Sequence, residues 1–127
     1  MATTLVSQGK AEDYIVYLDM TGTDDTDNTG TCLIQATDAA GNSLAERVLV
    51  HVWIADADFS EPDAQTDLSI LTGEQLYETE ANADYTVISN ASGLVNMNID
   101  AGGAKTVYVM AMCGGRIYSE QIDITSA

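Results

Sequence analysis

Apolar and polar side chains alternate with a period of two along much of this chain, a pattern typical of β-strands. The longest alternating run extends from Arg47 to Ala55. Valine and isoleucine occupy one face of this run, and leucine, histidine and tryptophan occupy the other: Val48, Val50, Val52 and Ile54, against Leu49, His51 and Trp53. Because both faces carry apolar groups, we expect this run to be a central strand of a sheet.

Shorter runs of the same kind follow one another along the rest of the chain. The pattern predicts strands at residues 15–18, 31–37, 68–71, 85–89, 94–100, 106–113 and 116–125. Segments rich in Gly, Asn, Asp and Ser separate these runs. They predict loops or turns at residues 21–30, 38–42, 90–93 and 101–104, and a two-residue hairpin turn at Gly114-Gly115.

Two segments interrupt this spacing. Residues 56–67 hold five acidic side chains and the only proline, Pro62, and predict a long exposed loop. Residues 72–83 are ambiguous, because their centre, Gln75 to Glu78, also fits one helical turn. The chain shows no convincing helix elsewhere. The pattern therefore predicts an all-β fold, a sandwich of about seven to nine short antiparallel strands.

The length of 127 residues suits one domain. We expect an N-terminal arm at residues 1–13 and a single sandwich domain at residues 14–127. No apolar run approaches the roughly 20 residues that span a bilayer. The first ten residues also lack the basic and apolar regions of a secretory signal.

Charge is the strongest compositional feature, with 20 Asp and Glu against 4 Lys and Arg and a formal net charge of -16. Nucleic acids are bound mainly through Lys and Arg, so this chain is not expected to bind DNA or RNA. Anionic membrane surfaces would repel it as well. Two interpretations remain: a solvated surface that keeps copies apart, which we favour, or a surface that meets a basic partner or metal ions.

The candidate metal and disulfide residues are few. Cys32, Cys113 and the single histidine, His51, cannot assemble a zinc site of Cys and His ligands. The order Cys32, Trp53, Cys113 leaves two alternatives, a disulfide beside a buried tryptophan or, as we favour, two free buried thiols. Calcium is the only cofactor that the residues suggest, at Asp24-Asp25-Thr26-Asp27-Asn28 or within the acidic loop at 56–67 (Asp56, Asp58, Glu61, Asp63 and Asp67). Asp- and Asn-rich turns are common without metal, so we expect no cofactor.

Catalysis has little support in the residues. The chain contains neither a Gly-x-Ser-x-Gly elbow nor a phosphate-binding glycine loop. A serine nucleophile would need His51, which lies within a predicted strand. Carboxylate pairs are available everywhere in so acidic a chain and discriminate nothing. We therefore expect a protein that is not an enzyme.

Three sequence segments, taken in their order along the chain, resemble the motifs of a known family. They are 37–48 (TDAAGNSLAERV), 90–99 (NASGLVNMNI) and 101–111 (AGGAKTVYVMA), followed by the Gly-Gly hairpin. Together they resemble the bacterial immunoglobulin-like domains of the invasin type, over roughly residues 32–125. The chain departs from that family's pattern at Ser43, where proline is usual, at Asn90, where aspartate is common, and in the length of the 56–83 insertion. The resemblance implies an immunoglobulin-like β-sandwich.

Such domains are found on bacterial surface proteins and in structural proteins of tailed bacteriophages. A lone domain beginning with Met1 and without repeats resembles the phage proteins more closely. The resemblance therefore implies a non-catalytic structural or binding protein, a capsid decoration (cement or head-spike) or accessory virion protein. Its partners would be the phage major capsid protein or other virion proteins. Its location would be the virion, assembled in the host cytoplasm. The alternative function is a surface adhesion domain that binds a host glycan or protein through the loops at 21–30 and 56–67.

Two further expectations concern assembly. Leu5, Val6 and Lys10 lie before the first predicted strand and are candidate contacts to a partner shell or a neighbouring copy, through strand addition. Capsid sites often lie at threefold positions, so a homotrimer is a further expectation. A frayed terminus is the simpler interpretation of residues 1–13.

Overall fold

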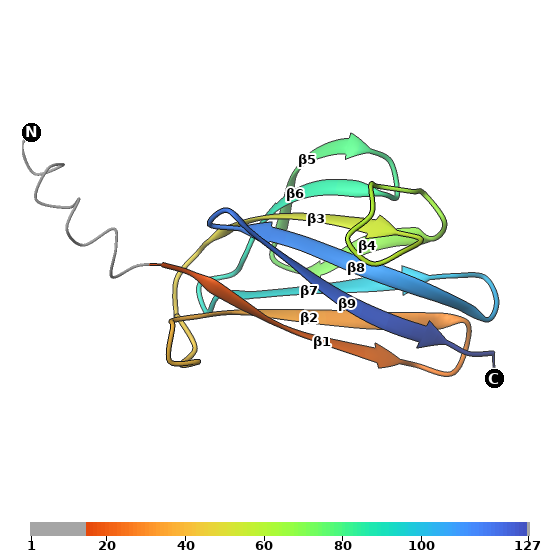
Figure 1. Cartoon of the computed structure of the whole chain (residues 1–127), viewed down its shortest axis with the longest axis horizontal. Coiled ribbons are helices and arrows are strands. Elements are labelled where there is room, and N and C mark those ends of the chain that lie inside the picture. The colour runs from red at the N-terminus through yellow and green to blue at the C-terminus, as the bar shows by residue number, and fades with distance from the viewer. Residues whose placement is uncertain (1–14, 127) are drawn as a thin grey trace, which may run out of the picture.

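The computed structural model describes residues 15–126, and within them the chain is all-β (Figure 1). Nine strands follow one another in the chain: β1 (Tyr17–Asp24), β2 (Thr29–Thr37), β3 (Leu49–Ala55), β4 (Asp67–Thr72), β5 (Glu74–Glu80), β6 (Asp84–Ile88), β7 (Leu94–Asp100), β8 (Lys105–Cys113) and β9 (Arg116–Ile124). Every strand pairing is antiparallel. The predicted all-β class is confirmed.

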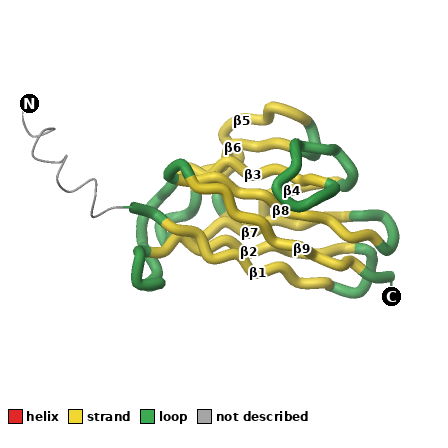
Figure 2. The backbone as a smooth tube through the Cα atoms, in the orientation of Figure 1, coloured by secondary structure: helices red, strands yellow, loops and turns green. Residues whose placement is uncertain are grey.

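The strands form two sheets that face each other (Figure 2). Sheet A has the order β1-β2-β7-β4, and sheet B has the order β5-β6-β3-β8-β9. When β1, β2, β3, β4, β7, β8 and β9 are lettered A to G, these orders reproduce the ABED and CFG sheets of an immunoglobulin domain. The β5–β6 hairpin is an insertion between D and E that extends the second sheet beyond C. The fold is an immunoglobulin-like β-sandwich.

The period of two in the sequence is visible in the core between the sheets. Alternate residues of the central strands are buried there, and one cluster joins both sheets through Ile34, Val52, Ile54, Met97, Ile99, Val107 and Val109. Each of these side chains is at most 1% exposed. Burying side chains of this size stabilises the fold by about 1.5 to 3 kcal/mol each.

The predicted loop at 21–30 is wrong, because most of it is strand. β1 runs on to Asp24 and β2 begins at Thr29, so only a tight turn separates them. Gly22 lies within β1. This position requires glycine because β9 of the other sheet passes close beside it. A Cβ atom on Gly22 would come within 2.6 Å of the Cγ1 atom of Ile122. The backbone N–H of Gly22 also donates a 2.8 Å hydrogen bond to the Glu120 carboxylate, which ties the two sheets together.

The helical turn considered for residues 72–83 is also wrong, because β5 occupies Glu74–Glu80. All seven residues of β5 are exposed, so no buried face marked this strand in the sequence. Backbone pairing with β6 holds β5 in place, and its register shifts twice, between Gln75 and Tyr77 and between Glu78 and Glu80. Register shifts and acidic side chains are devices that protect an edge strand from pairing with other chains.

Candidate binding face

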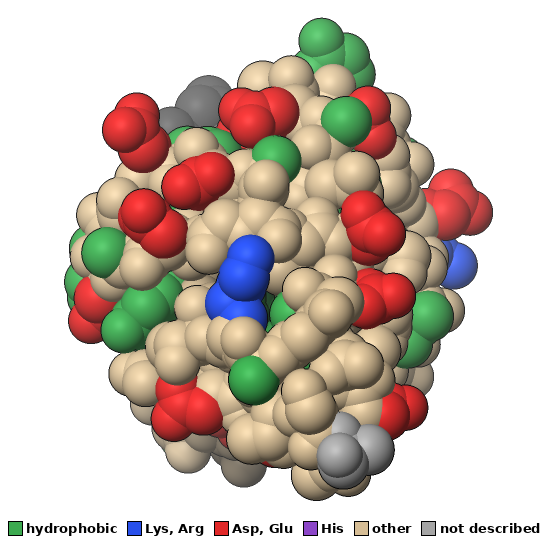
Figure 3. Space-filling view, turned by 90° about the vertical axis from the view of Figure 1, so that its right-hand side faces the viewer, with side chains coloured by type: hydrophobic (Ala, Val, Ile, Leu, Met, Phe, Trp, Pro, Cys, Tyr) green, Lys and Arg blue, Asp and Glu red, His purple; other side chains and the backbone are tan. Residues whose placement is uncertain are grey.

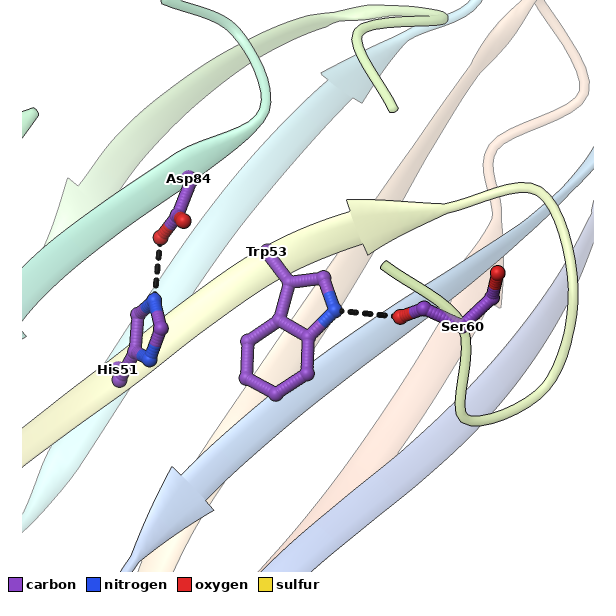
Figure 4. A network of polar contacts seen from close by, with 4 residues as sticks. All are labelled: His51, Trp53, Ser60 and Asp84. Carbon is purple, nitrogen blue, oxygen red and sulfur yellow. Dashed lines mark hydrogen bonds and ion pairs between the residues drawn. The ribbon is translucent and has the colours of Figure 1, made fainter. Parts of the chain in front are cut away.

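β3 directs His51 and Trp53 to the outer face of sheet B, away from the core (Figure 4). Alternation along the strand places these two side chains on one face, since they are two residues apart. The Nε2 atom of His51 contacts the carboxylate of Asp84 on the neighbouring strand β6. The His51 and Trp53 ring centroids lie 4.8 Å apart. The Trp53 indole donates a 2.9 Å hydrogen bond to the backbone carbonyl of Ser60.

The loop between β3 and β4, residues 56–66, folds over part of this outer face. The bond from Trp53 holds it at Ser60, and a hydrogen bond from the Ser119 hydroxyl of β9 holds it at Asp58. A second buried apolar cluster lies on this face of the sheet and consists of Trp53, Ala55 and Met110, with Tyr108 packed against it. The loop predicted at residues 56–67 is therefore present, and it is held in place by contacts with the outer face of sheet B.

Phe59 stands at an unusual point of this loop. Its φ of 53° lies in the left-handed region, which a bulky side chain rarely adopts. It is the only phenylalanine of the chain, and 63% of it is exposed to solvent. Backbone strain combined with an exposed aromatic side chain is typical of sites that contact a partner.

Exposed apolar side chains continue across the rest of the outer face. The strand registers place Tyr77, Thr86, His51, Met112 and Ile117 in one row across all five strands of sheet B. Leu49 lies two residues before His51 on the same side of β3. We call five exposed residues of this surface the binding face: Leu49 (59% exposed), Phe59 (63%), Tyr77 (66%), Met112 (38%) and Ile117 (48%). Exposed apolar patches are typical of interaction sites, so this surface is the candidate binding face.

An apolar cleft of about 510 Å³ adjoins the binding face at Leu49. Its lining is Ile15, Val16, Arg47, Val48, Leu49, Cys113 and Gly114. Arg47 donates a 3.4 Å hydrogen bond to the backbone carbonyl of Ser89. Arg116, paired with Cys113 across the β8–β9 hairpin, lies over the ring of Tyr17 at 4.3 Å. Both arginines of this very acidic chain thus lie at the end of the sandwich that carries the cleft.

We expect Trp53→Phe to loosen the loop over the outer face. The substitution keeps an aromatic ring but removes the N–H that binds Ser60, a loss of about 1 kcal/mol. A protease that cleaves after acidic residues should then cut the loop faster, since Asp56, Asp58 and Glu61 lie within it. Tyr108→Phe, in the same cluster, is the matched control and should be cut like the wild type. Equal cleavage of Trp53→Phe and wild type would contradict the proposed attachment of the loop.

The two cysteines are free thiols. Cys32 lies in the middle of β2 in the core, whereas Cys113 ends β8 beside the apolar cleft. Burial, with a smaller contribution from the Glu120 charge, raises the pKa of Cys32 to about 12. Burial also raises the pKa of Cys113. Both are therefore poor nucleophiles near neutral pH, and the interpretation as buried thiols is confirmed.

The segment considered for calcium, Asp24 to Asn28, forms the β1–β2 turn, and its Asp24 carboxylate binds groups of the chain itself. The Asp24 carboxylate accepts hydrogen bonds from the backbone N–H of Thr26, at 3.0 Å, and from the N–H and hydroxyl of Thr125, at 3.0 and 2.6 Å. These bonds, that of the Thr125 hydroxyl first, lower the pKa of Asp24. Residues 15–126 contain no group of three or more His, Cys, Asp or Glu arranged to hold a metal ion.

The carboxylate of Asp24 is expected to stabilise the fold in a pH-dependent way. Its folded pKa lies below the ordinary value of 3.8, so the stabilisation is complete well above that pH and is lost as pH falls below it. Asp24→Asn should therefore be less stable than wild type near neutral pH, and the difference should shrink at about pH 3. Urea unfolding at both pH values measures it.

Asp25→Asn is the control for that experiment. It removes the same charge from the same turn, but its carboxylate has only a long 3.5 Å contact with the Thr29 hydroxyl. A pH dependence that is equal in the two variants would show that overall charge, rather than the bonds to Thr125, is responsible.

The proposed partner contacts Leu5, Val6 and Lys10 lie outside the described residues. Within the described part, no helix is long and apolar enough to cross a membrane. Sequence reasoning missed most of the binding face. Two strands carried a signal for it in the sequence. Both faces of β3 are apolar, and Leu49 lies on its outer face; β8 is likewise apolar on both faces, and Met112 lies on its outer face.

Comparisons with known proteins bear on the fold alone. No protein-family model matches the chain, and no curated protein does. Among solved structures, it is similar to a conjugative transposon lipoprotein from Bacteroides eggerthii DSM 20697, with a TM-score of 0.51 and 11% identity over 87% of this chain and 97% of that one. A DUF4426 family protein from Pseudomonas aeruginosa PAO1 matches with a TM-score of 0.43 and 10% identity, over 90% and 94% of the two chains. At such low identity, the first likeness supports a shared β-sandwich only.

Proposed function

We propose that this protein is a non-catalytic binding protein that attaches to a larger assembly through its binding face. The observation that carries the proposal is the group of exposed apolar side chains on the outer face of sheet B, Leu49, Tyr77, Met112 and Ile117, together with Phe59 in the loop above it. Single exposed apolar residues are common on proteins, but several on one sheet face are typical of an interface. In this proposal His51 orders the face by pairing with Asp84 and packing on Trp53.

Charge narrows the kind of partner. A chain with a net charge of -16 repels its own copies and other acidic proteins. This repulsion is weakest at surfaces of the chain that carry few acidic side chains. The apolar side chains of the binding face flank His51 and Thr86 at the middle of sheet B, whereas Glu74, Glu78 and Glu80 lie along its β5 edge. The complementary surface has apolar anchors with basic residues around them.

We assign the partner to a virion. The support is the resemblance of residues 32–125 to invasin-type immunoglobulin-like domains, which also occur in tailed-phage structural proteins. The protein would then be a capsid decoration or accessory virion protein, with the major capsid protein or another virion protein as its partner.

Fractionation of particles from the source culture tests the assignment. Particles are separated on a density gradient, and this chain is quantified in each fraction by peptide mass spectrometry. Co-migration with intact capsids in a fixed stoichiometry is the expected result. Recovery of the chain free or on cells, with none on particles, would refute a virion role and support the alternative of surface adhesion.

A further inference from the structure

The apolar cleft beside Leu49 has the size and the lining of a site for a small ligand. Its volume of about 510 Å³ falls within the range of small-molecule sites, about 300 to 1,000 Å³. Four of its lining residues are aliphatic: Ile15, Val16, Val48 and Leu49. Ile15 is 42% exposed and Leu49 is 59% exposed. A ligand that covered them would remove apolar surface from water, which is favourable.

Positive charge gathers at this cleft, although the chain as a whole is strongly acidic. Arg47 belongs to the lining, and Arg116 follows the lining residue Gly114 by two positions on the β8–β9 hairpin. The two walls meet here, because a Cβ atom on Gly114 would lie 3.5 Å from the carbonyl oxygen of Val16. The Arg116 guanidinium lies 4.3 Å from the ring centroid of Tyr17, the residue after Val16. Arg116 is therefore at the margin of the cleft.

The rest of the described surface is less favourable to an anion. Of the three Lys and Arg residues within 15–126, only Lys105 lies elsewhere, at the start of β8 and at the opposite end of the sandwich. Acidic side chains are spread over that end, and Lys and Arg are scarce there (Figure 3). The field of the protein therefore favours an anionic group at the apolar cleft over the opposite end.

The arginines of the cleft retain donors for a ligand. The Arg47 side chain donates one long hydrogen bond, 3.4 Å, to the backbone carbonyl of Ser89. Among residues 15–126, neither Arg47 nor Arg116 forms a salt bridge. A guanidinium has five N–H donors in a planar arrangement that matches a carboxylate. The chemistry of the cleft thus suits a ligand with an aliphatic body and a carboxylate.

We propose that the apolar cleft binds a long-chain fatty acid, with the aliphatic chain against Ile15, Val48 and Leu49 and the carboxylate at Arg47. The side chains of the lining supply one strong hydrogen-bonding group, the Arg47 guanidinium, besides the weakly polar thiol of Cys113. A fatty acid has one group that needs such a partner, whereas an extended peptide would bring several backbone N–H and C=O groups. This ligand goes beyond the proposed function, and its binding does not depend on attachment to a virion.

Titration of the full, isotope-labelled chain with decanoate, followed by NMR, tests the proposal. We expect saturable shifts in the amide signals of residues 15–16, 47–49 and 113–114, with a Kd of about 10⁻⁴ to 10⁻³ M for so small a ligand. Decanol has the same chain without the carboxylate and should bind about three- to tenfold more weakly. Octanoate should bind at least about threefold more weakly than decanoate, because each buried methylene contributes up to about fourfold in affinity.

Four variants separate the two parts of the site. Arg47→Gln should weaken decanoate binding about three- to tenfold and leave decanol binding unchanged. Lys105→Gln removes the same charge at the opposite end and should bind decanoate like the wild type. Ile15→Ala should weaken the binding of both ligands, since it removes part of the apolar wall. Leu33→Ala, at a similarly exposed apolar residue of β2, should change neither.

Several outcomes would overturn the proposal, and none of them involves particles. Equal affinity for decanoate and decanol, or equal losses in Arg47→Gln and Lys105→Gln, would show that the arginine does not select a carboxylate. Shifts that never saturate, or that centre on Tyr77 and Ile117 of the binding face, would show that the cleft is not the site. A virion role could fail while decanoate binds as expected, so the two proposals are tested separately.

Discussion

The Gly93→Ala variant is expected to lose roughly 3 kcal/mol of stability, from two additive causes. The φ of Gly93 is +75°, a conformation that costs an L-residue about 1 kcal/mol. In addition, a Cβ atom at this position would lie 2.2 Å from the backbone carbonyl oxygen of Leu44. That contact requires the backbone to move, and it is a larger obstacle than a clash with a flexible side chain.

The movement would break hydrogen bonds that hold the 90–93 turn and the segment after β2 to the end of β2. The carbonyl of Gly93 accepts a 2.8 Å bond from Ala36, whose own carbonyl accepts a 2.9 Å bond from Leu44. Each lost bond costs about 1 kcal/mol. A domain has only about 5 to 15 kcal/mol of stability in total, so the variant should show a much lower midpoint in urea unfolding.

Gly41→Ala separates the two causes. Gly41 also has a positive φ, +87°, but a Cβ atom there would meet no atom within 4 Å. This variant should lose only the conformational contribution, about 1 kcal/mol. If Gly93→Ala and Gly41→Ala lose the same stability, close packing against Leu44 is not what requires glycine at position 93.

The central strands could be predicted from sequence because burial imposes a local pattern. Val50, Val52 and Ile54 alternate along β3 and all point into the core, and Val95, Met97 and Ile99 do the same along β7. The turn at 90–93 was predictable for a related reason, because Asn90 and Gly93 are residues that turns favour. In each case the information lies within a few neighbouring residues.

The errors arose where the cause lies far away in the chain. Gly22 in β1 indicated a loop, although glycine is needed there for the approach of Ile122, a hundred residues later. β5 was missed because it buries no side chain and is held by pairing with β6. The binding face has the same origin. Tyr77, Met112 and Ile117 come from three strands, and only the register brings them into one row.

The second large expected effect concerns this row. Ile117→Asp should weaken attachment to the partner assembly at least about 30-fold, which corresponds to the roughly 2 kcal/mol of an interface hot spot. Ile117 is 48% exposed near the end of sheet B, so the substitution should leave the core intact. A charge at this position would have to be desolvated against apolar anchors of the partner, and this desolvation is unfavourable.

Leu33→Asp is a closely matched control. Leu33 is 41% exposed, also lies in a strand and is also apolar, but it belongs to β2 in sheet A and is not part of the binding face. Both variants change the net charge equally, so repulsion by the overall charge affects them alike. Their melting temperatures should be similar, which can be checked before any binding experiment.

The most direct test of the account is therefore the attachment of these proteins to particles that lack the chain. Purified wild type, Ile117→Asp and Leu33→Asp are each incubated with such particles, and bound protein is quantified after sedimentation. We predict that wild type and Leu33→Asp bind with similar affinity, whereas Ile117→Asp stays largely in the supernatant. Equal binding of all three, or loss of binding by Leu33→Asp alone, would contradict attachment through the outer face of sheet B.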